Sequence, residues 1–208
     1  MIDQTTLITY LAILLGFVFI PGPAVLLTLA RASSSGTRTG VATALGIAAG
    51  DVVHTIMAVV GISAIILASA FLFSVIKYLG AAYLVYLGLR AIFEKAPVNQ
   101  PTAAGQLTFK AAFRQAILAE VLNPKSALFF LAFLPQFVRP ENGLVSLQLF
   151  VLGLLFVLMG LLSTLVTAVA AGRVGAFLRR NPVVLRWQGK VVGSIYCALG
   201  VRLALQEK

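Results

Sequence analysis

The sequence predicts an all-α integral membrane protein, on the evidence of its composition and of its long apolar stretches. Of its 208 residues, 60% are hydrophobic and 11% are charged, and the mean hydropathy is +1.01. So little polar surface cannot coat a water-soluble globule. Stretches such as 144–153 and 62–73 carry no charge, which suits helices that satisfy their own backbone groups better than the alternating strands of a β-barrel.

Six stretches are long enough to span a bilayer, because crossing about 30 Å of hydrocarbon takes about 20 apolar residues in a helix. We expect the first stretch to remain in the mature protein, because the residues before it include Asp3 and no base, unlike a signal peptide. The six predicted spans are 5–30, 41–68, 71–93, 111–134, 144–171 and 188–205.

The two halves of the chain resemble each other, which predicts a duplicated unit. The first and fourth spans each contain an interior proline, in Gly22-Pro23 and in Asn123-Pro124. The third and sixth spans share Lys, Gly and Tyr at three-residue intervals, although chance similarity is the alternative explanation for residues so common in membrane helices. The shared pattern is Lys77-x-x-Gly80-x-x-Tyr83 in the third span and Lys190-x-x-Gly193-x-x-Tyr196 in the sixth.

Two units of three spans each would enter the membrane from opposite sides, because three is an odd number. The predicted architecture is therefore six transmembrane helices in two inverted three-helix repeats, as in many secondary transporters. We place the first repeat at 1–93, a cytoplasmic connector at 94–109 and the second repeat at 110–208. The connector is rich in Pro, Gly and small polar residues, a composition that buries poorly and favours a flexible linker.

The basic residues indicate an orientation in the membrane and not a nucleic-acid partner. The formal net charge is +10, but the Lys and Arg residues are scattered between the spans and form no single patch. The connections after the first, third and fifth spans carry eleven of them, and the opposite side carries four. The positive-inside rule then places those connections in the cytoplasm and both termini outside it. We expect the membrane to be the inner (plasma) membrane of a bacterial cell.

Prolines inside the first and fourth spans predict that both helices are kinked or broken. Pro21, Pro23 and Pro124 each lack a backbone donor and clash with the preceding turn. With Gly22 and Asn123 as caps, a half-helix would start after each break, with unpaired N–H groups and a positive dipole end. Two such ends near the midplane favour an anionic group such as an amino-acid carboxylate, which marks a candidate transport site, whereas a purely architectural kink is the alternative.

Four ionisable residues within the spans are candidates for substrate binding and proton coupling. Burying Asp51 costs about 2.5–3.5 kcal/mol on insertion scales, so we expect it to bind a substrate ammonium, a proton or a cation unless it forms a buried ion pair. His54 shares the helix face of Asp51 and could relay protons, although a single histidine is more often only hydrogen-bonded. Glu120 offers a second carboxylate, and Lys125 fits either the substrate site or an interfacial anchor.

The other polar residues predict no enzyme, cofactor or metal centre. No span contains a cluster of metal ligands, a Ser/His/Asp set or a phosphate-binding glycine loop. The single Cys197 excludes an internal disulfide and paired-thiol chemistry. The fifth span is uncharged, with Ser163, Thr164 and Thr167 among glycines and aliphatic residues, so we expect it to be a packing scaffold.

Three motifs carry a family resemblance, namely Pro21-Gly22-Pro23, Gly46-x-x-x-Gly50-Asp51 and Asn123-Pro124-Lys125-Ser126. With them the chain resembles the lysine-exporter (LysE/RhtB) family of translocators over nearly its whole length. The resemblance implies export of amino acids such as lysine, threonine, homoserine or leucine, driven by the proton-motive force. Similar sequences usually have asparagine where this chain has Glu120, and the added acid could bias the site toward a cationic substrate or a different coupling ion.

The residues and the resemblance together predict a secondary active exporter that exchanges protons for amino acids. In this hypothesis the half-helix ends bind the substrate carboxylate, while Asp51 or Glu120 binds the ammonium or the proton. A divalent-cation exporter is one alternative, although hard cations usually require more oxygen ligands, and a non-transporting membrane scaffold is another. The expected partners are a small-molecule amino acid, protons and membrane lipid, with a second copy of the chain as a further candidate and no nucleic acid.

Overall fold

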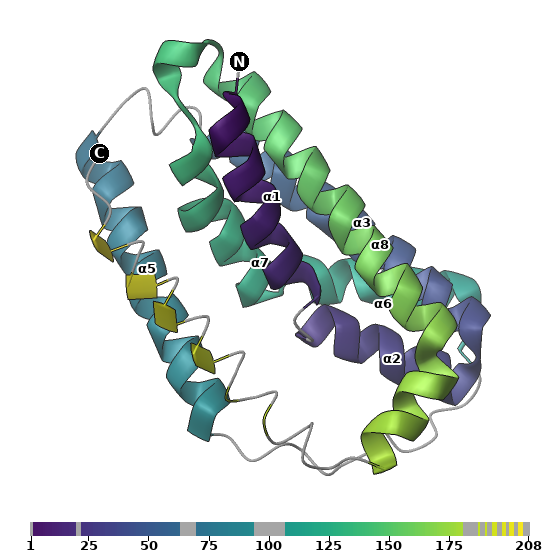
Figure 1. Cartoon of the computed structure of the whole chain (residues 1–208). Coiled ribbons are helices and arrows are strands. Elements are labelled where there is room, and N and C mark those ends of the chain that lie inside the picture. The colour runs from purple at the N-terminus through teal and green to yellow at the C-terminus, as the bar shows by residue number, and fades with distance from the viewer. Residues whose placement is uncertain are drawn as a thin grey trace.

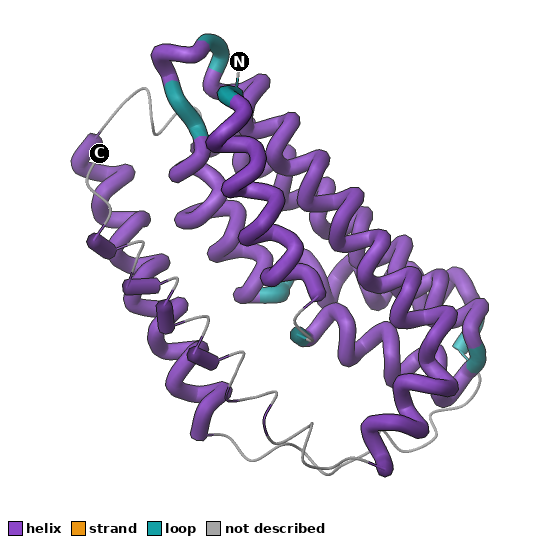
Figure 2. The backbone as a smooth tube through the Cα atoms, viewed as in Figure 1, coloured by secondary structure: helices purple, strands orange, loops and turns teal. Residues whose placement is uncertain are grey.

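The computed structural model describes residues 2–19, 22–62, 70–93 and 107–180, together with scattered residues between 187 and 205. Within these residues the chain is helical and contains no strand (Figure 2). The all-α prediction is therefore confirmed for the part of the chain that the structure describes. Pro21, residues 94–106 of the expected connector and much of the sixth predicted span lie outside the described residues.

Most of the helices follow one another with short connections (Figure 1). α3 continues into a π-helical turn, η1, and α7 continues through a second π-helical turn, η2, into the 3₁₀ turn η3. The elements are α1 (Gln4–Phe19), α2 (Pro23–Ser35), α3 (Thr37–Met57), η1 (Ala58–Ile62), α5 (Ala70–Phe93), α6 (Phe109–Val121), α7 (Pro124–Leu128), η2 (Phe129–Phe133), η3 (Leu134–Phe137), η4 (Pro140–Asn142) and α8 (Val145–Arg180).

The described residues contain two uninterrupted helices that are long and apolar enough to cross a membrane, Thr37–Gly61 and Val145–Ala171. Two bent helix pairs, α1 with α2 and α6 with α7 and its continuation, bring the number to four if each pair counts as one span. These are the second, fifth, first and fourth predicted spans. The arrangement of six spans as an inverted repeat, with its boundaries at 93 and 110, remains a prediction.

The first and fourth predicted spans are interrupted, as their prolines indicate. α1 ends at Phe19 and α2 begins at Pro23, with 46° between the two helices. α6 ends at Val121 and α7 begins at Pro124, and the bend there is 44°. Proline fits both helix starts because the first turn of a helix has no use for its missing N–H group.

Glycines allow α3 to lie against its neighbours at close range. A Cβ atom at Gly46 would overlap the Phe113 carbonyl and would lie 2.7 Å from the Cβ of Ala116 on α6. On the same helix, Gly50 faces Glu120, where a Cβ would lie 2.6 Å from the Glu120 Cβ. Gly46 and Gly50 therefore admit a neighbouring helix at close range, and α6 is that helix.

Aromatic side chains pack between α1, η2, η3 and the first half of α8. Ring centroids of neighbouring members lie 4.6–5.2 Å apart in tilted or edge-to-face contacts. The buried Tyr10 hydroxyl donates a hydrogen bond to the Leu152 carbonyl (2.8 Å), which joins this cluster to α8. The members of this cluster from the first predicted span, Tyr10 and Phe17, both belong to α1, before the break. The aromatic cluster consists of Tyr10, Phe17, Phe129, Phe130, Phe133, Phe137 and Phe156.

α5 lies beside the described residues of the last segment and antiparallel to them (Figure 1). A Cβ at Gly88 would lie 2.6 Å from the Gly193 carbonyl, and a Cβ at Gly200 would lie 2.7 Å from the Ala81 carbonyl. Glycines therefore let α5 and the described residues of the last segment approach each other closely.

We expect Gly46→Ala to lower the thermal unfolding midpoint of the purified protein by several degrees. Overpacking costs about 1–3 kcal/mol, and the gain in helix propensity is at most about 1 kcal/mol. Gly16→Ala is the matched control, because it lies in α1 with no atom within 4 Å of its added methyl. If Gly46→Ala unfolds at the same temperature as the control in detergent, α3 and α6 do not pack as closely as the structure shows.

Candidate functional site

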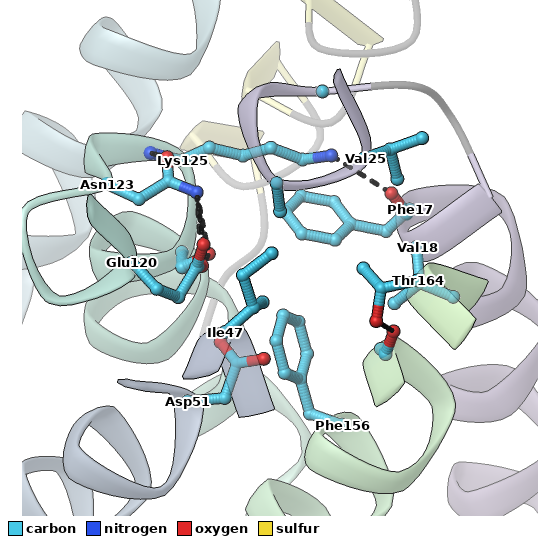
Figure 3. A pocket seen from close by; sticks show the side chains of 14 residues that line it. Phe17, Val18, Val25, Ile47, Asp51, Glu120, Asn123, Lys125, Phe156 and Thr164 are labelled. Carbon is cyan, nitrogen blue, oxygen red and sulfur yellow. Dashed lines mark hydrogen bonds between the residues drawn. The ribbon is translucent and has the colours of Figure 1, made fainter. Parts of the chain in front are cut away.

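A polar cavity lies at the level of the two helix breaks and is lined by α1, α2, α3, α6, α7 and α8 (Figure 3). Its volume for the centres of water molecules is about 40 Å³, which exceeds the roughly 10–15 Å³ that a cavity needs to hold a water. Apolar side chains, including Phe17 and Phe156, form much of its wall. Its polar lining side chains are Asp51, Glu120, Asn123, Lys125, Ser126 and Thr164.

The first break leaves carbonyl groups at the end of α1 without helical partners, and side chains from other helices satisfy two of them. Lys125 Nζ donates to the Phe17 carbonyl oxygen (3.1 Å), and Ser163 Oγ donates to the Val18 carbonyl oxygen (2.8 Å). Nζ also lies 4.2 Å from the centre of the Phe17 ring, where a cation is attracted to the π face. In Figure 3 the Lys125 side chain extends across the cavity toward α1.

Gly22 leaves space for the Lys125 side chain, which passes close to it. A Cβ atom at Gly22 would lie 2.9 Å from Lys125 Nζ and 3.2 Å from its Cδ. Gly22 also precedes Pro23, the first residue of α2, and has an extended conformation. Gly22 and Pro23 therefore start a new helix, and Gly22 also leaves room for a cation from the second half of the chain.

The second break is stabilised by Asn123 and His54. The Asn123 side-chain oxygen accepts a hydrogen bond from the Lys125 backbone N–H (3.0 Å), which caps α7. His54 Nε2 lies 3.0 Å from the Glu120 carbonyl oxygen near the end of α6. A carbonyl oxygen can only accept, so Nε2 carries the proton in this contact. The His54 ring also stacks on Phe130 at 5.6 Å.

The Glu120 carboxylate is hydrogen-bonded by residues of the second break and of the helix that follows it. Asn123 Nδ2 lies 3.1 Å from both carboxylate oxygens, and Ser126 Oγ donates to Oε1. Glu120 is 3% exposed, and Gly50 of α3 backs its Cβ. Both oxygens of this buried carboxylate therefore have hydrogen-bond donors within the protein.

Asp51 differs from Glu120 because it lacks such donors. It is 2% exposed, and its Oδ1 has no hydrogen-bond partner in the part of the chain that the structure describes. A Cβ added to Gly160 on α8 would lie 3.4 Å from Oδ2, which is an ordinary contact distance, so α8 passes close to the carboxylate. Leaving a buried carboxylate oxygen unpaired is costly, which distinguishes Asp51 from the other polar residues of the lining.

The structure brings five of the sequence-predicted site residues to this cavity: Gly22, Asp51, Glu120, Asn123 and Lys125. The exposed Pro23 and Pro124 start the two half-helices and do not line the cavity. His54 is buried outside the lining and binds a backbone carbonyl, so the geometry favours a structural role over proton relay. Pro21 lies outside the described residues.

The fifth predicted span contributes residues that the sequence analysis assigned to packing alone. Thr164 and Gly160 line the cavity, and Ser163 donates a hydrogen bond to the Val18 carbonyl at the end of α1. Gly160 and Thr164 are four residues apart and share a helix face, and this spacing is the only sequence feature that indicates their common role. The scaffold interpretation of α8 was therefore incomplete.

The described residues contain no group of three or more His, Cys, Asp and Glu side chains that could hold a metal ion. Asp51 and Glu120 alone offer too few oxygens for a hard divalent cation, which prefers six or more ligands at Ca²⁺ sites. The geometry gives no support to the divalent-cation alternative.

Comparison with known proteins identifies relatives along almost the full length of the chain. The model of the family described as LysE type translocator matches residues 15–207. An uncharacterised membrane protein of Pseudomonas aeruginosa is 35% identical, with 91% of this chain and 92% of the relative aligned. An uncharacterised membrane protein of Vibrio cholerae is 31% identical over 95% of each chain, and YrhP of Bacillus subtilis, also an uncharacterised membrane protein, is 30% identical over 96% of this chain and 99% of its own. No solved structure is significantly similar to the chain.

Ser163→Ala tests whether the first break depends on its side-chain donor. Removing the hydroxyl leaves the buried Val18 carbonyl without this partner, which costs about 1–3 kcal/mol, so the thermal unfolding midpoint should fall by several degrees. Ser34→Ala is the control, because that serine is exposed on α2. Equal midpoints for the two variants would show that Ser163 does not hold the end of α1.

Proposed function

Because this chain belongs to the LysE type translocator family, we propose that it is a secondary active exporter that exchanges protons for amino acids. The family is one of translocators and the relatives are membrane proteins, and both findings support a transport role. The observation that carries the amino-acid proposal is the placement of one buried cation and two buried carboxyl groups around a single cavity between two broken helices.

The cavity has the charge pattern that an α-amino acid requires. Lys125 reaches into it from α7, and a substrate carboxylate would bind the Lys125 ammonium. Asp51 approaches it from α3 with an unpartnered carboxylate oxygen, which suits the substrate ammonium. The two groups belong to different predicted repeats, so both halves of the protein would bind one substrate, as in other transporters of this architecture.

Coupling to protons follows from the same charges. With Asp51, Glu120 and Lys125 all ionised, the cavity carries one net negative charge, which either a proton or the substrate ammonium can neutralise. If both compete for Asp51, the empty carrier returns with a proton and the loaded carrier leaves without one. Mutually exclusive binding at one carboxylate is sufficient to couple export of the amino acid to entry of the proton.

Asp51→Asn should abolish amino-acid exchange driven by a pH gradient. The substitution keeps the size of the side chain but removes the charge that binds the ammonium or the proton. The measurement is uptake of labelled amino acids into proteoliposomes preloaded with unlabelled amino acid, with an imposed pH gradient. The expected rate is that of protein-free liposomes, while gel filtration shows a folded protein.

Glu141→Gln is the matched control, because this carboxylate is exposed near the start of η4, and its exchange rate should equal that of the unsubstituted protein. Exchange by Asp51→Asn at the control rate would remove Asp51 from the mechanism. A lack of exchange of any amino acid by the unsubstituted protein would contradict the proposed function itself.

A further inference from the structure

Most polar groups of the cavity either have hydrogen-bond partners in the protein or would bind the carboxylate and ammonium of the substrate, so few remain for the substrate side chain. If Lys125 takes the substrate carboxylate and Asp51 takes its ammonium, Glu120 is the only ionisable side chain left in the lining. The part of the substrate that remains must then lie against whatever else lines the cavity.

Glu120 is not available to a second positive charge without breaking existing contacts. Both of its oxygens accept from Asn123 Nδ2, and Oε1 also accepts from Ser126 Oγ. Gly50 packs directly behind its Cβ, so the side chain cannot retreat toward α3. A lysine or arginine side chain would have to displace Asn123, which also caps α7.

The rest of the wall is apolar and part of it is fixed by ring packing. Phe17 and Phe156 line the cavity at a centroid distance of 5.9 Å, and both contact the ring of Phe129 at 4.6 Å. Val25 of α2 and Ile47 of α3 complete this apolar wall (Figure 3). A charged side chain placed there would lose its water without gaining a partner.

The size of the cavity sets a second limit. The cavity has a volume of about 40 Å³ for the centres of water molecules, which is too small for even the backbone atoms of an amino acid unless its walls move, and each further heavy atom of a substrate requires more movement. The aromatic side cannot move without disturbing the cluster behind it. Small side chains are therefore favoured over long ones.

We infer that the transported substrates are small, electrically neutral α-amino acids and that the site rejects cationic ones such as lysine and arginine. This inference rests on the proposed function, because it assumes that an amino acid binds between Lys125 and Asp51. It also reverses the expectation that Glu120 favours a cationic substrate, because the structure shows that carboxylate already hydrogen-bonded.

A competition experiment tests this selectivity. Proteoliposomes carrying the full chain exchange labelled alanine, and unlabelled alanine, serine, valine, leucine, lysine and arginine compete in turn. Alanine and serine should compete best, leucine less well, and lysine and arginine at least about tenfold more weakly than alanine. Lysine or arginine competing as well as alanine, or being exchanged in its place, overturns the inference but leaves amino-acid export standing. Exchange of no amino acid at all overturns both.

Two substitutions that change the cavity in opposite directions show whether its wall sets the selectivity. Val25→Ala enlarges the cavity and should improve competition by valine and leucine relative to alanine, with no gain for lysine. Gly160→Ala adds a methyl at an ordinary contact distance of 3.4 Å from Asp51 Oδ2, so it should fold and should weaken valine and leucine more than alanine.

Gly16→Ala serves as the control for both variants, because its methyl meets no atom within 4 Å. The order of competitors should be unchanged in this control. If the order is also unchanged in both Val25→Ala and Gly160→Ala, the side chain of the substrate does not lie in this cavity and the inference fails.

Discussion

The structure depends on one constraint, which is that backbone groups freed by a break in a membrane helix must find partners within the protein. Hydrocarbon offers no hydrogen bonds, so each unsatisfied carbonyl in a lipid environment is costly. Prolines interrupt the helix between Phe19 and Pro23 and again between Val121 and Pro124. Side chains from other elements then reach across to the exposed carbonyls, and they bring polar atoms to the centre of an otherwise apolar bundle.

The same contacts that complete the backbone also arrange the charges. Lys125 satisfies the Phe17 carbonyl and thereby holds its ammonium at the cavity, while Asn123 caps α7 and fixes the Glu120 carboxylate. Asp51 is the exception, because no described side chain or backbone group satisfies its Oδ1. In the proposed function, the ammonium of a substrate or a proton supplies the partner that Oδ1 lacks.

The interruptions and the buried acids could be predicted from sequence because they follow from local rules. Proline excludes an unbroken helix wherever it falls, and a carboxylate within a span is rare enough to indicate function. The roles of Ser163, Thr164 and Gly160 could not be predicted, because they depend on how α8 is rotated against α1 and α3. For Glu120 the i+3 spacing to Asn123 can be read from the sequence, but only the tertiary structure shows that its carboxylate is hydrogen-bonded to Asn123 and Ser126.

We propose that the two broken helices enclose a water-accessible cavity that binds the substrate. Thiol accessibility at Thr164→Cys, in a chain whose own cysteine is replaced by Cys197→Ser, tests it most directly. A membrane-impermeant thiol reagent, applied to proteoliposomes from each side in turn, should label the new cysteine, and a transported amino acid should slow the labelling. A cysteine that no reagent reaches from either side, or one labelled at the same rate whatever amino acid is present, would contradict the account.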